Sequence, residues 1–357
     1  MALRDVIGQD KAVNILLRTG RRGRIPSAYL FAGESGIGKK FTALNLAKAL
    51  NCLTPPFSRD AGGTDSRFTD ACDECPSCRK TVSGVHPDVL FISPEGGQIR
   101  IEEIRAVDNM LSLKAFEGRY KIVIVDDADT MNQYAANAFL KTLEEPPEDS
   151  LIILVSSNPS RLPDTIRSRC SRINFTPLPQ DACKRVIEKT ITPGPAVRSK
   201  KAGGASSPQA DALKSLSDEG LRLLTIVRLS MGRPGNAVSG DIIEERAWFI
   251  DLLKGMLNAE KDGWASKEEM ERWFDLILIL FRDMAVLKVT GDETKLVNID
   301  LADYIRKISS SAGIKVIIEN YRELNTLKGY LTFNLNKSLT WNYTGSLLRK
   351  TMDMTHA

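Results

Sequence analysis

The stretch GESGIGKK at residues 33–40 has the residue types and spacing of a phosphate-binding loop, except at its last position. The P-loop pattern is G-x-x-x-x-G-K followed by Ser or Thr, and Lys40 stands where that hydroxyl belongs. In such a loop, glycines let backbone N–H groups close around phosphates at a helix N-terminus, and Lys39 would reach the β- and γ-phosphates. The candidate nucleotide-binding residues of this loop are Gly33, Gly36, Gly38, Lys39 and Lys40.

An acidic element lies downstream, where the apolar run KIVIV at 121–125 is followed by Asp126 and Asp127. A buried strand that ends in aspartate presents a carboxylate to Mg²⁺ across from a P-loop, which is the Walker B arrangement. The alternative is a strand that ends in an ordinary acidic turn. Because the P-loop pattern precedes it in the same chain, we favour the Mg²⁺-site interpretation for these two residues.

Two departures from the motifs argue against efficient ATP hydrolysis. The ammonium of Lys40 can only donate hydrogen bonds and repels a cation, whereas a Ser or Thr hydroxyl binds Mg²⁺ directly. Asp127 stands where ATPases of this type usually carry the glutamate that polarises the attacking water, and it is one methylene shorter. A misplacement of about 1 Å can cost about 100-fold in rate. The sequence therefore speaks against Mg²⁺ and leaves open whether ATP or ADP binds.

Four of the six cysteines form a cluster, Cys52-x19-Cys72-x2-Cys75-x2-Cys78. In structural sites Zn²⁺ prefers four such ligands in a closed tetrahedron, and a cysteine cluster in a reducing compartment indicates metal before disulfide. We therefore predict a structural Zn²⁺ site. The long interval after Cys52 leaves an alternative, in which Cys52 is buried in its own helix and is not the fourth ligand.

Length and composition limit the class of protein. A chain of 357 residues has room for about two or three domains, and its net charge of +4 does not by itself indicate nucleic acid. It contains no apolar run of about 18 residues, and its N-terminus lacks a secretory hydrophobic region, so a cytoplasmic location is expected. Only two histidines, His86 and His356, are present, which disfavours a Ser-His-Asp mechanism.

The first 175 residues alternate short apolar runs with helix-like segments, which predicts a doubly wound parallel sheet. Within residues 132–147, Ala136, Phe139 and Leu143 recur at helical spacing, and Pro146 ends that helix. The expected strands are 29–33, 88–93, 121–127, 151–157 and 171–175.

The pattern changes in two stretches and again in the last third of the chain. Residues 54–71 are loop-like, and residues 192–210, rich in Pro, Gly, Ala and Ser, predict a flexible insertion. From about residue 211 onward, helical patterns follow one another without a strand-like run, which predicts an all-α bundle.

Several sequence words resemble the bacterial clamp-loader branch of the AAA+ ATPases, and together they span nearly the whole chain. The most specific are NAFLKTLEEPP at 137–147 and IRSRC at 166–170. DVIGQDKAV at 5–13 resembles the segment that closes over adenine, and YLTFNLNKSL at 330–339 resembles a segment of the helical collar. The cysteine cluster also matches the zinc module that this branch inserts after the P-loop helix.

The resemblance implies an α/β P-loop AAA+ domain followed by two helical domains. Residues 1–176 would form the AAA+ domain, with a parallel sheet and the zinc module at about 50–80. Residues 177–240 would form a helical lid that contains the flexible insertion, and residues 241–357 a helical collar for oligomerisation.

The resemblance also assigns roles to single residues. Arg169 matches the family's arginine finger, which is donated in trans and stabilises charge on a neighbour's γ-phosphate. Ser157 and Asn158, at the end of a predicted strand, fall where a sensor 1 polar residue would contact the γ-phosphate. In the word GRPGNAV, Gly235 falls where a motor subunit carries its sensor 2 arginine. Arg233 is offset by two residues, so it would face another side of a helix.

The implied function is that of a mostly non-hydrolysing subunit in a hetero-oligomeric clamp-loader ring, with weak or no ATPase activity of its own. Its implied partners are the tau/gamma and delta subunits, the sliding clamp and, through the complex, primer-template DNA, within a DNA-directed DNA polymerase holoenzyme. One alternative is an ATP-hydrolysing motor subunit. Another is a zinc-dependent nucleic-acid-binding module, although no aromatic and basic stripe stands out and aromatic residues make up only 6%.

Overall fold

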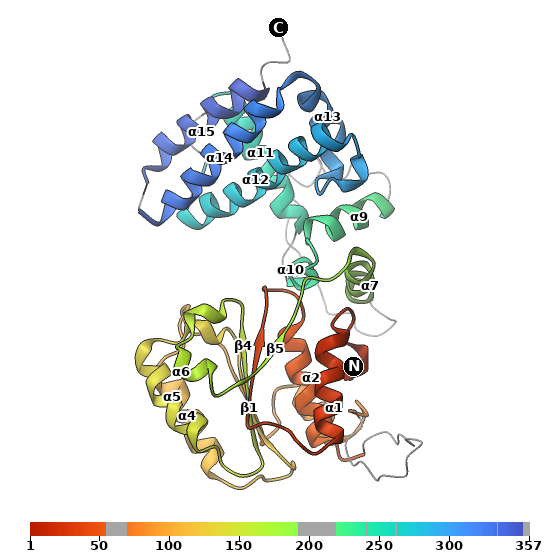
Figure 1. The fold of residues 1–357 in the computed structure, drawn as a ribbon, viewed down its shortest axis with the longest axis vertical. Helices are drawn as coiled ribbons and strands as arrows, with labels where there is room; N and C mark the ends of the chain where they lie inside the picture. The colour runs from red at the N-terminus through yellow and green to blue at the C-terminus, as the bar shows by residue number, and fades with distance from the viewer. Residues whose placement is uncertain (55–69, 192–218, 240–241, 261–262, 334, 353–357) are drawn as a thin grey trace, which may run out of the picture. The chain divides into compact units, whose positions relative to one another are not determined.

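The computed structural model describes residues 1–54, 70–191, 219–239, 242–260, 263–333 and 335–352, which divide into two compact units (Figure 1). The first unit is Met1–Lys189 with Gly232–Asn236, and the second is Thr190–Met231 with Ala237–Ala357. The insertion expected at 192–210, and all but the ends of the loop-like stretch 54–71, lie outside the described residues. The division into three domains at residues 176 and 240 stays a prediction.

The first unit contains a parallel sheet of five strands in the order β2-β3-β4-β1-β5. The three central strands are fully buried, which explains their unbroken apolar sequences, whereas the two edge strands are partly exposed. All five strands that the sequence predicts are confirmed within two residues at each end. Their bounds are Ala28–Ala32 (β1), Val89–Ile92 (β2), Lys121–Val125 (β3), Ser150–Ser156 (β4) and Ser171–Asn174 (β5).

Helices cover both faces of this sheet, as Figure 1 shows. On one side lie α4 and α5, whose Ile104, Val107 and Phe139 are fully buried against alternate residues of the central strands. On the other side lie α1 and α2. Helix α5 begins where the Asn132 side chain accepts from Ala135 N–H, and it ends two residues before Pro146, as predicted. The bounds are Asp10–Arg21 (α1), Lys39–Asn51 (α2), Ile101–Ser112 (α4) and Gln133–Glu144 (α5).

Further elements, most of them short, lie beside several of the candidate site residues. Helix α3 belongs to the cysteine cluster, α6 contains the first two residues of the IRSRC word, and α10 follows Arg233. Their bounds are Pro76–Val82 (α3), Asp164–Arg167 (α6), Gln180–Ile191 (α7) and Pro234–Ser239 (α10), with 3-10 turns at Leu3–Asp5, Ala128–Thr130 and Pro159–Arg161.

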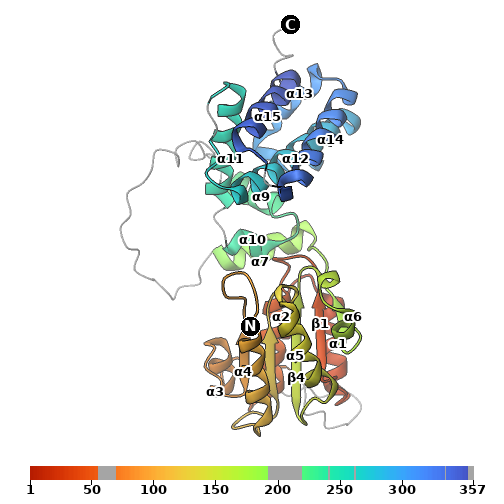
Figure 2. The same ribbon diagram turned by 90° about the vertical axis from the view of Figure 1, so that its left-hand side faces the viewer.

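In the residues that the structure describes, the second unit consists of helices and their connections without a strand, which confirms the expected all-α region (Figure 2). Its core gathers around α12, where Trp273, Phe274 and Phe281 are fully buried. Asp283 on the same helix is also fully buried, and its carboxylate accepts the backbone N–H groups of Val297 and Asn298. The bounds are Glu219–Leu229 (α9), Ile242–Leu257 (α11), Lys267–Thr290 (α12), Ala302–Ser311 (α13), Ile314–Tyr330 (α14) and Lys337–Met352 (α15). Among the described helices, none is long and apolar enough to cross a membrane.

Asp88, just before β2, fastens the connection that leads into the acidic strand β3. Its carboxylate accepts the backbone N–H groups of Phe116, Glu117 and Gly118 at 2.7, 2.8 and 2.7 Å. Replacing Asp88 by Asn removes the charge and replaces one acceptor oxygen by an NH₂ group, which cannot accept from these backbone N–H groups. Because hydrogen bonds to a charged group contribute about 1.5–3 kcal/mol each, we expect the free energy of unfolding of the first unit to fall by about 3 kcal/mol in urea titrations followed by circular dichroism.

The same carboxylate makes the stability of this unit depend on pH. Burial alone raises the pKa of Asp88, but the three backbone donors outweigh it and hold the pKa below its usual range. A depressed folded pKa means that the stabilisation is present above the unfolded value of about 3.9 and is lost as the pH falls through the folded pKa. Asp88→Asn should flatten this acid limb, whereas Asp149→Asn, at an exposed carboxylate, should not. An unchanged acid limb in Asp88→Asn would contradict the assignment.

Candidate functional site

The predicted phosphate-binding loop lies between β1 and α2, in the strand–loop–helix context that a P-loop requires. Gly33, Gly36 and Gly38 all have positive φ values, of 151°, 76° and 95°. These conformations favour glycine, and a Cβ on Gly33 would lie only 2.5 Å from the backbone oxygen of Phe175. The loop therefore has the backbone that an anion-binding nest needs, and helix α2 starts directly after it at Lys39.

The Lys39 side chain is turned onto the loop itself. Its ammonium donates to the backbone oxygens of Gly33 and Glu34, both at 2.6 Å, and to the hydroxyl of Ser157 at 3.3 Å. The residue is only 5% exposed. Burial lowers the pKa of Lys39, although the nearby carboxylates of Asp127 and other acids oppose that change. To reach phosphates, the ammonium has to exchange these carbonyl partners for phosphate oxygens.

The acidic pair after β3 faces the P-loop helix, as predicted. Lys40 forms an ion pair with Asp126, Nζ to Oδ2 at 3.2 Å. Asp127 adopts a left-handed conformation with φ of 44°. Burial, followed by the neighbouring carboxylates of Asp126 and Asp129, raises the pKa of Asp127. The two carboxylates that the sequence assigns to Mg²⁺ are thus opposite the residue that replaces the metal-binding hydroxyl.

Asp129 is a site residue that the sequence reasoning missed. Its Oδ1 accepts from the hydroxyl of Ser156 at 2.6 Å and from the backbone N–H of Ser157 at 3.1 Å, which fixes the end of β4 beside the acidic turn. Ser157 in turn contacts the Lys39 ammonium. The Asn158 side chain bonds instead to the hydroxyl of Ser160 at 2.5 Å, so its sensor role stays a prediction. The only available signal was the third aspartate in the word DDAD.

The segment around Gly235 closes against the P-loop. Its backbone N–H donates to the oxygen of Gly36 at 2.8 Å, and a Cβ on Gly235 would lie 2.8 Å from the Cα of Gly36. The position that aligns with the sensor 2 arginine therefore has no room for a side chain here. Arg233 differs from its prediction, because α10 begins one residue later and no helix face applies. Its guanidinium lies 3.5 Å from the Glu34 carboxylate, at the edge of the loop.

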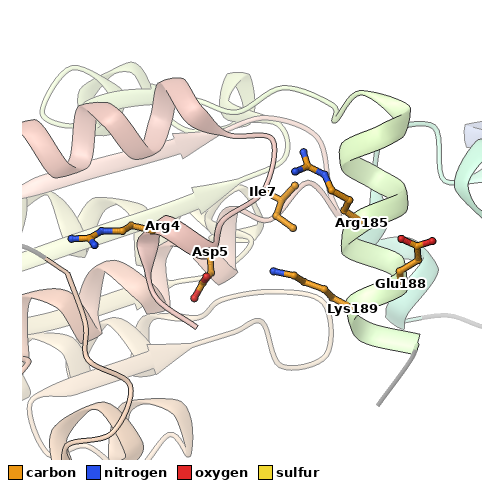
Figure 3. Close-up of a pocket in the computed structure, with 6 residues that line it drawn as sticks. All are labelled: Arg4, Asp5, Ile7, Arg185, Glu188 and Lys189. Carbon is orange, nitrogen blue, oxygen red and sulfur yellow. The ribbon is translucent and has the colours of Figure 1, made fainter. Parts of the chain in front are cut away.

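An open hollow of about 460 Å³ lies between the N-terminal segment and α7. Figure 3 shows that three of its lining residues come from each element, and that Ile7 is the apolar one among them. A nucleobase pocket is lined mainly by apolar side chains, so this mixed-charge lining does not have that chemistry. The lining residues are Arg4, Asp5, Ile7, Arg185, Glu188 and Lys189.

The four clustered cysteines come together in space, and Cys52 is among them. The Sγ atoms of Cys52, Cys72, Cys75 and Cys78 all lie within 4.8 Å of one another. Burial raises the pKa of the Cys72 thiol, but donors including the Thr54 hydroxyl outweigh it and lower the pKa to about 6. Four thiol ligands at this spacing can hold one metal ion, so the long interval after Cys52 does not exclude it from the cluster.

Two aspartates that the sequence reasoning did not single out tie this cluster to the N-terminus. Asp70 accepts the backbone N–H groups of Leu3 at 2.9 Å and of Arg4 at 3.1 Å. Asp73 forms ion pairs with the terminal ammonium of Met1, at 2.8 Å, and with the buried Lys48 of α2. The cysteine cluster thus also anchors the first residues of the chain.

Arg169 lies just after α6, on the connection between β4 and β5. Its guanidinium donates to the backbone oxygen of Thr165 at 2.8 Å and to the Glu144 carboxylate at 2.5 Å. The Arg169 side chain is 35% exposed and that of Glu144 is 50% exposed. The two most specific words of the family resemblance, LEEPP and SRC, therefore meet through this ion pair.

Comparisons with known proteins identify the family of this chain. A family model described as "DNA polymerase III, delta subunit" matches residues 8–179. The delta′ subunit of DNA polymerase III from Bacillus subtilis is 30% identical over 84% of this chain and 83% of its own length. That from Pseudomonas aeruginosa is 32% identical over 82% of both chains. This chain belongs to the family of DNA polymerase III delta′ subunits.

The tau subunits, the alternative to delta′, match this chain either at lower identity or over a smaller part of it. The tau subunit of Bacillus subtilis is 26% identical over 90% of this chain and 56% of its own length. The tau subunit of Escherichia coli is 33% identical, but over only 52% of this chain and 27% of its own length. The departures at Lys40, Asp127 and Gly235 predict a delta′ subunit and not a tau/gamma motor, and the delta′ relatives confirm that prediction.

Proposed function

We propose that this delta′-family chain is a mostly non-hydrolysing subunit of the DNA polymerase III clamp loader, which places the sliding clamp on primed DNA. In this role it stands beside tau/gamma and delta subunits in a hetero-oligomeric ring in the cytoplasm. Its contribution to ATP hydrolysis is Arg169, donated to the nucleotide site of a neighbouring motor subunit. Arginine suits this role because its guanidinium is always charged and its donors form a planar fork.

The observation that carries this proposal is the partial exposure of the Arg169 guanidinium and its ion pair with Glu144. This guanidinium lies at the surface and is held by Glu144 in an ion pair in which both side chains are partly exposed. Exposed pairs of this kind contribute about 0–1 kcal/mol, so a phosphate of a neighbouring subunit can replace Glu144 at little cost. In the meantime Glu144 and the backbone oxygen of Thr165 keep the guanidinium in a defined position.

The chain's own nucleotide site supports a passive role. The loop glycines fit phosphate, because their conformations turn the backbone into a nest, and Lys39 would supply the charge. The residues do not fit Mg²⁺, since Lys40 pairs with the Asp126 carboxylate that the ion would need. A bound ATP or ADP would therefore be held by the loop without a reaction following. This arrangement disfavours the motor alternative, which requires the metal.

The cysteine cluster is proposed to hold a structural Zn²⁺. The donor set is four thiols, the preferred set for closed zinc sites, and the four sulfur atoms are already close together. Four thiolates would fill a tetrahedral shell and leave no open coordination position for chemistry. The ion would fix α3 and, through Asp70 and Asp73, the N-terminal residues.

Steady-state ATPase assays test the passive role directly. The purified chain with ATP and Mg²⁺ should show no turnover above a sample without protein. Adding the chain to tau/gamma and delta subunits, with clamp and primed DNA, should raise ATP turnover and clamp loading of the mixture. Turnover by the isolated chain at the rate of a motor subunit would instead support the tau/gamma-type function.

A further inference from the structure

Lys40 occupies the place between the P-loop helix and β3 that a metal ion would need. It is the second residue of α2, and its ammonium lies 3.2 Å from Oδ2 of Asp126, the carboxylate directly after β3. The same ammonium lies 4.2 Å from the centre of the Phe91 ring on β2. The carboxylate and the aromatic face both attract a cation, so the position of this ammonium is defined from two sides.

Mg²⁺ does not fit beside this side chain. The ion requires oxygen ligands in a near-octahedral shell at about 2.0–2.1 Å, and a P-loop hydroxyl normally supplies one of them. Lys40 offers no oxygen, and its ammonium already lies against Asp126. An ion placed here would meet the repulsion of this charge and lack the hydroxyl ligand.

The carboxylates around this site are partly neutralised by two lysines of the chain itself. Three carboxylates, those of Asp126, Asp127 and Asp129, gather at the end of β3, and the ammonium groups of Lys39 and Lys40 act on them. Lys39 makes its hydrogen bonds to the loop and to Ser157, which leaves the direct ion pair with Asp126 to Lys40.

We propose that Lys40 is a built-in cation that replaces Mg²⁺ in this site, so that any nucleotide binding by the chain is independent of Mg²⁺. The ammonium connects the P-loop helix to the Walker B strand through this ion pair without a metal or a phosphate. A lysine–aspartate ion pair thereby takes the place that a Mg²⁺ ion would have between the P-loop helix and β3. This inference does not depend on Arg169, and either proposal can fail without the other.

Isothermal titration with ADP and with ATP, in EDTA and then in Mg²⁺, tests the inference on the full chain. For the unaltered chain, Mg²⁺ should change the Kd by less than about twofold, or neither buffer should give binding. Lys40→Thr restores the hydroxyl and removes the charge, and Mg²⁺ should then tighten nucleotide binding about tenfold or more, within the range of coupling between two ligands. Lys40→Met is the matched control, because it removes the charge without supplying a ligand, and it should not gain this dependence.

Two outcomes would overturn the inference. One is tightening of about tenfold by Mg²⁺ in the unaltered chain, and the other is a folded Lys40→Thr variant that Mg²⁺ does not affect. Circular dichroism and thermal unfolding establish that each variant is folded, which is expected because Lys40 is half-exposed. Adding Asp126→Asn to Lys40→Thr should abolish the gained dependence, and its persistence would show that the ion binds elsewhere.

Discussion

Replacing Arg169 by alanine is expected to lower ATP turnover at the neighbouring subunit's site about 1,000-fold or more, while the complex still assembles. An arginine finger contributes about 10³–10⁵ in rate because it neutralises charge on the γ-phosphate in the transition state. In the free chain the guanidinium contacts only groups on its own surface in the described structure, Thr165 and Glu144, so its removal leaves no buried charge unpaired. Single-turnover hydrolysis in the reconstituted complex measures this effect.

Two further variants separate a finger from a structural arginine. Arg172→Ala removes an exposed arginine three residues along the chain, bonded only locally to Asn174 at 2.8 Å in the described structure, and should leave turnover unchanged. Glu144→Gln weakens the ion pair that holds Arg169 without removing the guanidinium, so it should cost far less than Arg169→Ala. Unchanged turnover in Arg169→Ala, in a complex of normal composition, would refute the proposed contribution.

Replacing Cys78 by serine is expected to abolish zinc binding and to unfold the region around α3 while the sheet stays folded. Structural zinc sites in small peptides contribute about 10–16 kcal/mol of apparent binding free energy, which is folding free energy for the segment that supplies the ligands. Cys78 is fully buried in the cluster. Metal analysis should find one zinc per native chain. Hydrogen exchange should show lost protection in residues 70–83 and at Leu3 and Arg4, whose N–H groups bond to Asp70.

Cys170→Ser is the matched control for this result. It also removes one thiol from the first unit, but Cys170 is not one of the clustered cysteines. Its zinc content and the protection of residues 70–83 should equal those of the native chain. Native protein that contains no zinc, or a Cys78→Ser variant that keeps the ion, would contradict the metal assignment. Loss of protection in β3 and β4 as well would show that the cluster stabilises the whole unit.

Sequence patterns predicted the elements of the first unit because those patterns have short periods. A run such as KIVIV at 121–125 is apolar throughout because β3 is covered on both faces, and this can be read without any partner strand. The motif likewise predicted a glycine-rich phosphate-binding loop, in which Gly33 and Gly38 have positive φ values. Fold class, strand positions and the approximate site could therefore be predicted locally.

Contacts between distant segments could not be predicted in this way. Gly235 contacts Gly36, and Arg169 forms an ion pair with Glu144. These residues are far apart along the chain, and no repeating sequence pattern indicates that they meet. Arg233 also shows that element boundaries are hard to predict locally. The sequence placed it on a helix face, but α10 begins one residue after it.

The sequence alone determined which groups are available: a P-loop with a lysine for its hydroxyl, two carboxylates after a strand, four clustered cysteines and an arginine in SRC. Only the tertiary structure decided what these groups contact. It brought Cys52 within 4.8 Å of the other cysteine sulfurs and set Lys40 against Asp126. The physical reason is that residue type fixes charge and hydrogen-bonding capacity, whereas the partner of each group depends on how strands and helices pack across the whole unit.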